Sequence, residues 1–263
     1  MSRNTIYVVP SLKAKAALLA EATAWSQAMG FIPVARRGRT TEQIRADYGD
    51  DFLIYTSRGP QIVRREGTYF FSLNMAELRI QHIRHGVTDH FIEALGASGA
   101  VRLLDCTCGF GADAIVASFA LPQGSTVQAM EIAPLMAAVT SWGFSHFVHD
   151  HQDVTAALRR ISLRCSDYRS YLQDANSSAY DILYFDPMFT RPVETSCQFQ
   201  PVRELLDHGH LTAKNIEAAR AKARKRVVIK GRDFRELVKA FPETRLYGGK
   251  YSRIGYAVLE CDT

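Results

Sequence analysis

The hydrophobic pattern of the chain changes character near residue 100. Upstream, short apolar stretches alternate with turns and with two segments whose apolar residues recur at helical spacing. The pattern predicts strands at residues 5–10, 31–38, 51–57, 60–66 and 68–74, and helices at 12–30 and 40–50, the second with Thr40 or Thr41 as its cap. Because turns containing glycine separate the last three strands, we expect an antiparallel meander. Residues 75–96 then return to helical spacing.

Downstream, strand and helix patterns alternate. Near-continuous apolar stretches predict strands at 101–107, 126–132, 161–167, 181–187 and 225–231, and residues 112–121 and 133–147 have helical spacing. Apolar strands joined by helices are typical of a parallel sheet covered on both faces. Residues 244–260 predict two strands around a polar turn. We therefore expect an α/β fold, with a doubly wound, Rossmann-like sheet that ends in an antiparallel C-terminal hairpin.

Two domains follow from this change of pattern. Residues 1–75 predict a small N-terminal α+β domain, and residues 76–263 predict a linker helix followed by the doubly wound domain. No apolar run is long enough to span a membrane, and the first residues lack the order of a signal peptide. We expect a cytoplasmic protein with no membrane partner.

Composition narrows the classes of ligand. The chain has 263 residues and a net charge of +5, with arginine clusters at 36–39 and 220–226, which is compatible with a nucleic-acid partner. The five cysteines are odd in number, so we expect reduced thiols. Cys106 and Cys108 form a C-x-C pair that no second cysteine pair follows, so we expect no metal.

The most informative motif is a glycine-rich turn after the strand at 101–107. It contains Asp105, Thr107, Gly109, Gly111 and Asp113. Glycines at the carboxyl end of a parallel strand let the backbone approach a nucleotide. The turn lacks the G-x-G-x-x-G pattern that serves a pyrophosphate, and its two acidic residues would repel one. They suit the ammonium and sulfonium groups of S-adenosylmethionine.

Two further acidic residues extend this site. Glu131 ends the next strand, where ribose hydroxyls are bound in such folds. Asp167 ends the third strand and has two interpretations, a contact with the adenine amino group or a cap for the following helix.

The fourth strand leads into Asp186-Pro187-Met188-Phe189. A carboxylate and a backbone carbonyl can accept the two protons of a conjugated amine, and an aromatic ring can stack on a flat base. An N-capping aspartate beside a packed phenylalanine is the structural alternative. The motif predicts methyl transfer to a planar amino group, without a covalent enzyme intermediate.

This tetrapeptide resembles the [Asn/Asp/Ser]-Pro-Pro-[Tyr/Phe] signature of amino-group methyltransferases. Together with VRLLDCTCGFGADAI and KRVVIKGRDF, it makes the chain similar to the RsmJ (YhiQ) family from about residue 51 onward. That resemblance implies a class I methyltransferase fold, S-adenosylmethionine as cofactor and guanine N2 in small-subunit ribosomal RNA as acceptor. It places cofactor contacts on Ala112, Asp113, Glu131, Ile132, Asp167, Tyr168 and Asp186.

Several residues near the acceptor motif complete the prediction. We expect Asp186, Pro187 and Phe189 to act in catalysis, and Met188, Arg191, Lys230 and Arg232 to contact the substrate. The chain departs from the family at Ala112 and Ile132, where arginine is common, and in its first fifty residues. Three alternatives remain: an amino-group methyltransferase acting on DNA adenine, a protein amide or a small molecule; an NAD-linked oxidoreductase; and a non-catalytic RNA-binding protein that kept the fold.

Overall fold

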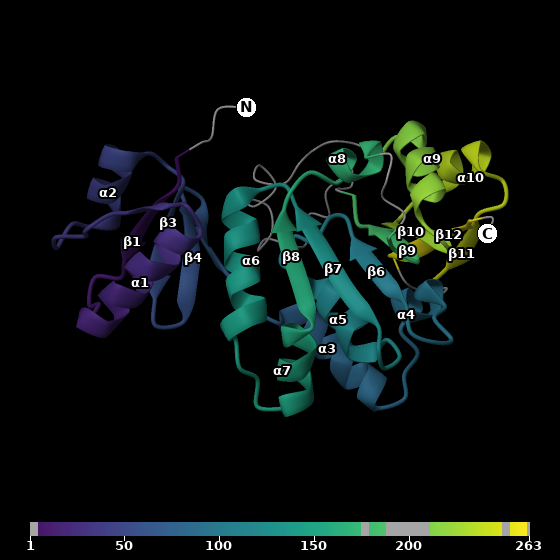
Figure 1. Cartoon of the computed structure of the whole chain (residues 1–263), viewed down its shortest axis with the longest axis horizontal. Helices are drawn as coiled ribbons and strands as arrows, with labels where there is room; N and C mark the ends of the chain where they lie inside the picture. Colours follow the sequence, from purple (N-terminus) through teal and green to yellow (C-terminus); the bar gives the residue numbers. More distant parts are fainter. Residues whose placement is uncertain (1–4, 175–178, 188–210, 249–252, 262–263) are drawn as a thin grey trace.

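The computed structural model describes residues 5–174, 179–187, 211–248 and 253–261, which form two sheets that lie side by side (Figure 1). The N-terminal sheet has the strand order β2-β1-β3-β4-β5. Its elements are β1 (Tyr7–Pro10), α1 (Ala16–Ala28), β2 (Ile32–Pro33), α2 (Thr41–Tyr48), β3 (Phe52–Thr56), β4 (Gly59–Arg64) and β5 (Gly67–Phe70). The predicted antiparallel meander is confirmed in β3, β4 and β5, and Thr40 caps α2 in a capping box with Gln43.

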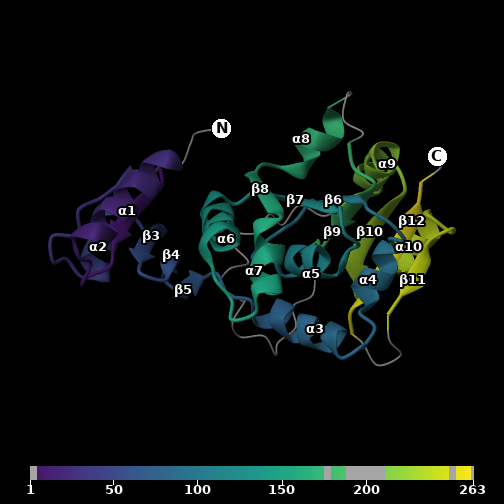
Figure 2. The same ribbon diagram turned by 60° about the horizontal axis from the view of Figure 1, so that its bottom comes forward.

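The helical stretch predicted over residues 75–96 is two helices, α3 (Asn74–Arg84) and α4 (His90–Leu95). Gly86 separates them with a φ of 75°, a conformation that favours glycine. Asp89 then starts α4 by accepting hydrogen bonds from the backbone nitrogens of Phe91 and Ile92. Figure 2 shows α3 beside α5 of the larger unit and away from α1 and α2.

The second sheet has seven strands in the described residues, in the order β11-β12-β10-β9-β6-β7-β8. Its elements are β6 (Arg102–Asp105), α5 (Ala112–Ala120), β7 (Thr126–Glu131), α6 (Pro134–His146), α7 (Gln152–Arg159), β8 (Ile161–Cys165), α8 (Tyr168–Gln173), β9 (Ile182–Phe185), α9 (Ala213–Lys222), β10 (Arg226–Gly231), α10 (Arg235–Ala240), β11 (Arg245–Tyr247) and β12 (Gly255–Glu260). Strands β6 to β10 pair in parallel, and β12 and β11 add the antiparallel portion. The predicted doubly wound fold is confirmed.

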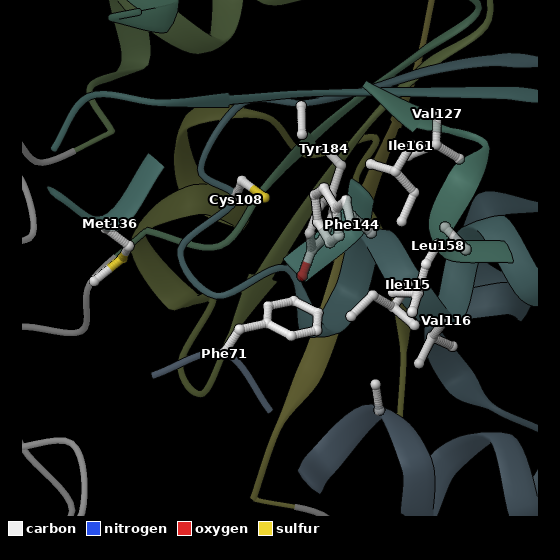
Figure 3. Packing of buried hydrophobic residues seen from close by; sticks show 14 of the residues in the cluster. Phe71, Cys108, Ile115, Val116, Val127, Met136, Phe144, Leu158, Ile161 and Tyr184 are labelled. Atoms are coloured by element: carbon white, nitrogen blue, oxygen red, sulfur yellow. The ribbon is translucent and has the colours of Figure 1, made fainter. Parts of the chain in front are cut away.

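Apolar side chains cover both faces of this sheet. On one face, Ile115 of α5 and Phe144 of α6 belong to a large buried cluster (Figure 3). Ile80 of α3 belongs to the same cluster. On the other face, a second cluster contains Leu172 of α8 and Ile216 of α9. None of the described helices is long and apolar enough to cross a lipid bilayer.

The N-terminal sheet shares the first of these clusters with the larger unit. The ring of Phe71 lies edge-on to Phe144, with ring centroids 5.9 Å apart (Figure 3). The indole nitrogen of Trp142 in α6 donates a 3.1 Å hydrogen bond to the hydroxyl of Tyr55 in β3. A domain boundary after residue 75 stays a prediction, because the two units are packed through a continuous core.

Candidate functional site

The carboxyl ends of the parallel strands bring the predicted residues to one edge of the second sheet (Figure 1). Asp105 and Glu131 are the last residues of β6 and β7, and Asp186 directly follows β9. Lys230 is the next-to-last residue of β10. The chain order of the strands reverses between β6 and β9, and ligands of doubly wound sheets bind at such a point.

The glycine-rich turn between β6 and α5 requires its glycines. Gly109 and Gly111 have φ values of 56° and 82°, in the left-handed region. A Cβ atom on Gly111 would also collide with the ring of Phe144. The hydroxyl of Thr140 donates a 2.8 Å hydrogen bond to the carbonyl of Gly109. Helix α6 therefore holds this turn in place from one side.

Asp105 is a buried carboxylate with no cationic partner among the residues that the structure describes. It is 1% exposed, and it accepts a 3.0 Å hydrogen bond from the backbone nitrogen of Thr107. Burial raises the pKa of Asp105 well above its ordinary value, and the nearby carboxylates of Asp113, Asp186 and Glu131 add to this effect. A bound cation would offset both causes, so the residue fits the ammonium group of S-adenosylmethionine.

Glu131 connects two turns at the same edge. Its Oε2 accepts a 2.8 Å hydrogen bond from the backbone nitrogen of Gly109, and its Oε1 accepts one of the same length from Ala133. The side chain is buried, so both carboxylate oxygens are fixed in position. A carboxylate is an acceptor of hydrogen bonds, the chemistry that a ribose diol requires. The ribose contact stays a prediction.

Asp167 has the geometry of a helix cap. It precedes α8 and accepts a 2.8 Å hydrogen bond from the backbone nitrogen of Arg169. The guanidinium of Arg169 also contacts its carboxylate at 2.8 Å. Tyr168 is buried, with its ring edge-on to Phe185. The structural alternative considered for Asp167 therefore holds, and the predicted adenine contact is untested.

The backbone of Asp186 is hydrogen-bonded to the cofactor turn. Its amide nitrogen donates a 2.7 Å hydrogen bond to the hydroxyl oxygen of Thr107. Its carboxylate Oδ2 lies 2.9 Å from Nζ of Lys230. Pro187 follows and is half-buried. The other predicted acceptor residues lie outside the described residues: Met188, Phe189 and Arg191.

Protein side chains contact both carboxylate oxygens of Asp113. Nη1 of Arg79 contacts Oδ1 at 2.5 Å, while Nζ of Lys230 and the hydroxyl of Tyr184 contact Oδ2 at 2.9 and 2.8 Å. The two cations lower the pKa of Asp113 below its ordinary value, despite burial. Neither Arg79 nor Tyr184 was predicted from the sequence, because nothing local distinguishes them from a surface arginine and a core tyrosine.

The remaining predicted residues also lie at this edge. Ala112 is the first residue of α5, and Ile132 follows β7. Arg232 follows β10 and is exposed. In the described part of the chain, no three His, Cys, Asp or Glu side chains are placed to hold a metal ion. Cys106 and Cys108 are free thiols whose burial raises their pKa values.

Comparison with known proteins adds an independent line of support. Residues 68–254 match the family model SAM_MT, described as "Putative SAM-dependent methyltransferase". Uncharacterized protein YpiP of Bacillus subtilis is 31% identical over 196 residues, which cover 74% of this chain and 76% of YpiP. Ribosomal RNA small subunit methyltransferase J of Legionella pneumophila (strain Lens) is 28% identical over 166 residues, which cover 61% of this chain and 63% of that protein.

A solved structure agrees with the fold. The SAM-dependent methyltransferase NGO1261 from Neisseria gonorrhoeae is similar over 97% of this chain and 95% of its own, with a TM-score of 0.63 and 18% identity. The similarity extends over the N-terminal sheet and confirms the predicted class I methyltransferase architecture. The chain therefore belongs to the RsmJ-type family of S-adenosylmethionine-dependent methyltransferases, with S-adenosylmethionine as its cofactor.

Proposed function

We propose that this methyltransferase modifies the exocyclic N2 amino group of a guanine in small-subunit ribosomal RNA. One structural observation carries the proposal: the Asp186 carboxylate stands beside the cofactor turn, with Oδ2 bound by Lys230. In the described residues this leaves Oδ1 for an acceptor. The RNA target is supported by the names of relatives such as the Legionella protein, and the family motif supports the amino acceptor.

The chemistry of the acceptor explains why a carboxylate is needed. The lone pair of an amino group conjugated to a base is delocalised, so the nitrogen is a weak nucleophile. Asp186 and the carbonyl of Pro187 would accept hydrogen bonds from the two amino protons and favour a pyramidal nitrogen. Stacking of the base on Phe189, and contacts from Met188 and Arg191, remain proposals about residues outside the described ranges.

S-adenosylmethionine, when bound, supplies a methyl group activated by its positive sulfonium. The acceptor nitrogen forms a bond to the methyl carbon as the sulfur–carbon bond breaks, and the nitrogen then loses one proton. The chain contributes position and electrostatics. Asp105 and Glu131 would hold the cofactor's ammonium and ribose, and Asp186 would orient the acceptor and take up the proton.

The charge of the molecule is compatible with an RNA substrate. The net charge is +5, and Arg232 is exposed beside the acceptor edge. We propose that Arg232 contacts a phosphate or a base. The ammonium of Lys230 contacts the carboxylates of Asp113 and Asp186.

The test compares modified nucleosides of small-subunit ribosomal RNA in cells with and without the gene, using mass spectrometry. We expect N2-methylguanosine to decrease when the gene is removed. The wild-type gene should restore it, and Asp186→Ala should not, although this variant should remain folded. Asp233→Ala is the matched control, because Asp233 is an exposed carboxylate after β10.

Unchanged N2-methylguanosine would overturn the guanine assignment. The acceptor would then be sought among DNA adenine, protein amides and small molecules, with the same two variants and radiolabelled S-adenosylmethionine. Near-normal turnover by Asp186→Ala on the identified acceptor would remove Asp186 from the acceptor role.

A further inference from the structure

Five charged side chains form an unbroken series of ion pairs that leads into the acceptor site. Their order is Asp89, Arg79, Asp113, Lys230 and Asp186, and we call them the charge network. Arg79 contacts both oxygens of Asp89, at 2.7 and 2.8 Å, and reaches Asp113 at 2.5 Å. Lys230 Nζ lies 2.9 Å from an oxygen of Asp113 and 2.9 Å from an oxygen of Asp186.

Each member comes from a different place in the chain. Arg79 belongs to α3, Asp89 precedes α4, and Asp113 lies in the first turn of α5. Asp186 follows β9, and Lys230 belongs to β10. The network therefore connects the segment that follows the N-terminal sheet with both the cofactor turn and the acceptor motif.

Burial and charge make the ends of the network different. The side chain of Asp113 is 8% exposed, whereas that of Asp186 is 30% exposed, the highest value in the network. Each cation contacts two carboxylates, so three negative charges face two positive charges. The uncompensated negative charge is best solvated at Asp186, the end that faces the acceptor. A negative Asp186 is the form that accepts hydrogen bonds from an amino group.

The centre of the network has little freedom to rearrange. Asp113 receives three donors, because the hydroxyl of Tyr184 adds a 2.8 Å hydrogen bond to those of Arg79 and Lys230. The guanidinium of Arg79 also lies 5.4 Å from the ring centroid of Phe91 in α4. Asp113 therefore anchors Lys230, and Arg79 anchors Asp113.

We propose that Arg79 and Lys230 are positioning residues that keep Asp186 ionised and oriented, so that the linker helix α3 is part of the acceptor site. The proposal rests on the acceptor role proposed above for Asp186. It gives α3 a function beyond connecting the two units.

The direction of the effect follows from the groups around Asp186. Burial raises the pKa of Asp186, and Lys230 is the strongest opposing influence. The negative charge of Asp113 raises this pKa further, Asp105 also faces the carboxylate, and Arg79 lowers the pKa. An opposite charge at this range shifts a carboxyl pKa by about 1–3 units, so loss of Lys230 should raise the pKa of Asp186 by a similar amount.

The experiment follows the titration of the Asp186 carboxyl carbon by NMR in protein labelled at aspartate, saturated with S-adenosylhomocysteine. The signal is assigned by its absence in Asp186→Asn. We expect Lys230→Met to raise the pKa of Asp186 by about one unit or more, and Lys230→Arg to restore most of the change. Arg79→Gln should give a smaller rise, because it acts through Asp113.

Arg84→Gln is the matched control. Arg84 lies on the same helix, but its guanidinium pairs with Asp153 of α7 at 2.6 Å, so the titration should not change. If Lys230→Met does not fold, Arg79→Gln still tests the proposal. The proposal would be overturned if the pKa of Asp186 stayed at its wild-type value in Lys230→Met and Arg79→Gln, or in whichever of the two folds.

The titration needs no acceptor, so its result is separate from the identity of the RNA target. Once an acceptor is known, the acid limb of kcat should move to higher pH in Lys230→Met, with the affinity for S-adenosylmethionine changed less than threefold. A uniform fall in kcat at all pH values, with no displaced limb, would indicate a purely structural role and contradict the proposal.

Discussion

The hydroxyl oxygen of Thr107 accepts a 2.7 Å hydrogen bond from the backbone nitrogen of Asp186, so the cofactor turn is bonded directly to the acceptor motif. The two residues are far apart in sequence and meet because β6 and β9 are neighbouring parallel strands. This bond fixes the backbone of Asp186, and so the point from which its carboxylate extends, relative to the cofactor turn.

Thr107→Val should impair turnover more than folding. Valine preserves the shape of threonine but leaves the Asp186 amide without its acceptor, which costs about 1–3 kcal/mol when the group is buried. We expect a lower kcat and a modest loss of stability in urea unfolding. Thr107→Ser keeps the hydroxyl and should recover most of the activity; equal losses in both variants would argue against the bond.

Affinity for S-adenosylmethionine should increase with pH because of Asp105. Burial raises the pKa of Asp105, so its protonated form is favoured in the free protein at low pH. Only the ionised form pairs with the cofactor's ammonium, and ionisation grows as pH rises through that pKa. Calorimetry at several pH values should show tighter binding toward higher pH and proton release below the pKa. Asp105→Asn should bind weakly and with a flatter pH dependence.

The same residue affects the stability of the free protein with the opposite sign. Because the pKa of Asp105 in the folded state is above its unfolded value, its contribution to stability is present at low pH and is lost as pH rises through the folded pKa. The gain in Tm from saturating S-adenosylmethionine should therefore grow with pH. A gain that shrinks with pH would contradict the pairing.

Gly111→Ala should destabilise the protein for two reasons. Its φ of 82° is unfavourable for alanine, and the added Cβ would collide with Phe144. Gly124→Ala separates these causes, since Gly124 has a φ of 86° but its Cβ would meet the nearest atom, in Ala100, at 3.4 Å. We expect the loss at Gly111 to exceed that at Gly124 by about 1–3 kcal/mol in urea unfolding. Equal losses would show that Phe144 moves aside freely.

Arg37→Asn should stabilise the N-terminal unit. Arg37 has a φ of 50° in a turn closed by a hydrogen bond from the Arg39 nitrogen to the Arg36 carbonyl. Asparagine tolerates this conformation better than arginine, so we expect a gain of up to about 1 kcal/mol in urea unfolding. Arg58→Asn, at a turn residue whose own φ is not positive, should change stability little. A loss at position 37 would mean that the guanidinium makes a favourable interaction that outweighs the strain.

The sequence alone determined the fold class, because the alternation of apolar strands with helices leaves few ways to bury a sheet on both faces. It also located the glycine turn and the acidic residues at strand ends, since parallel strands place their carboxyl ends at one edge. Local pattern did not show the break between α3 and α4, because the apolar residues on either side of it keep helical spacing while Gly86 takes a φ of 75°.

The pairing of charges was decided only by tertiary structure. Arg79 and Asp113 are separated by 34 positions, and Asp113 and Lys230 by 117. No periodicity links them; they meet because α3 packs on α5, and because β10 pairs with β9, whose Tyr184 contacts Asp113. From the sequence, we predict that Lys230 is a basic residue that contacts the substrate. In the fold, its ammonium binds two carboxylates. The partners of a buried charge depend on which elements pack together, and only the folded chain determines that.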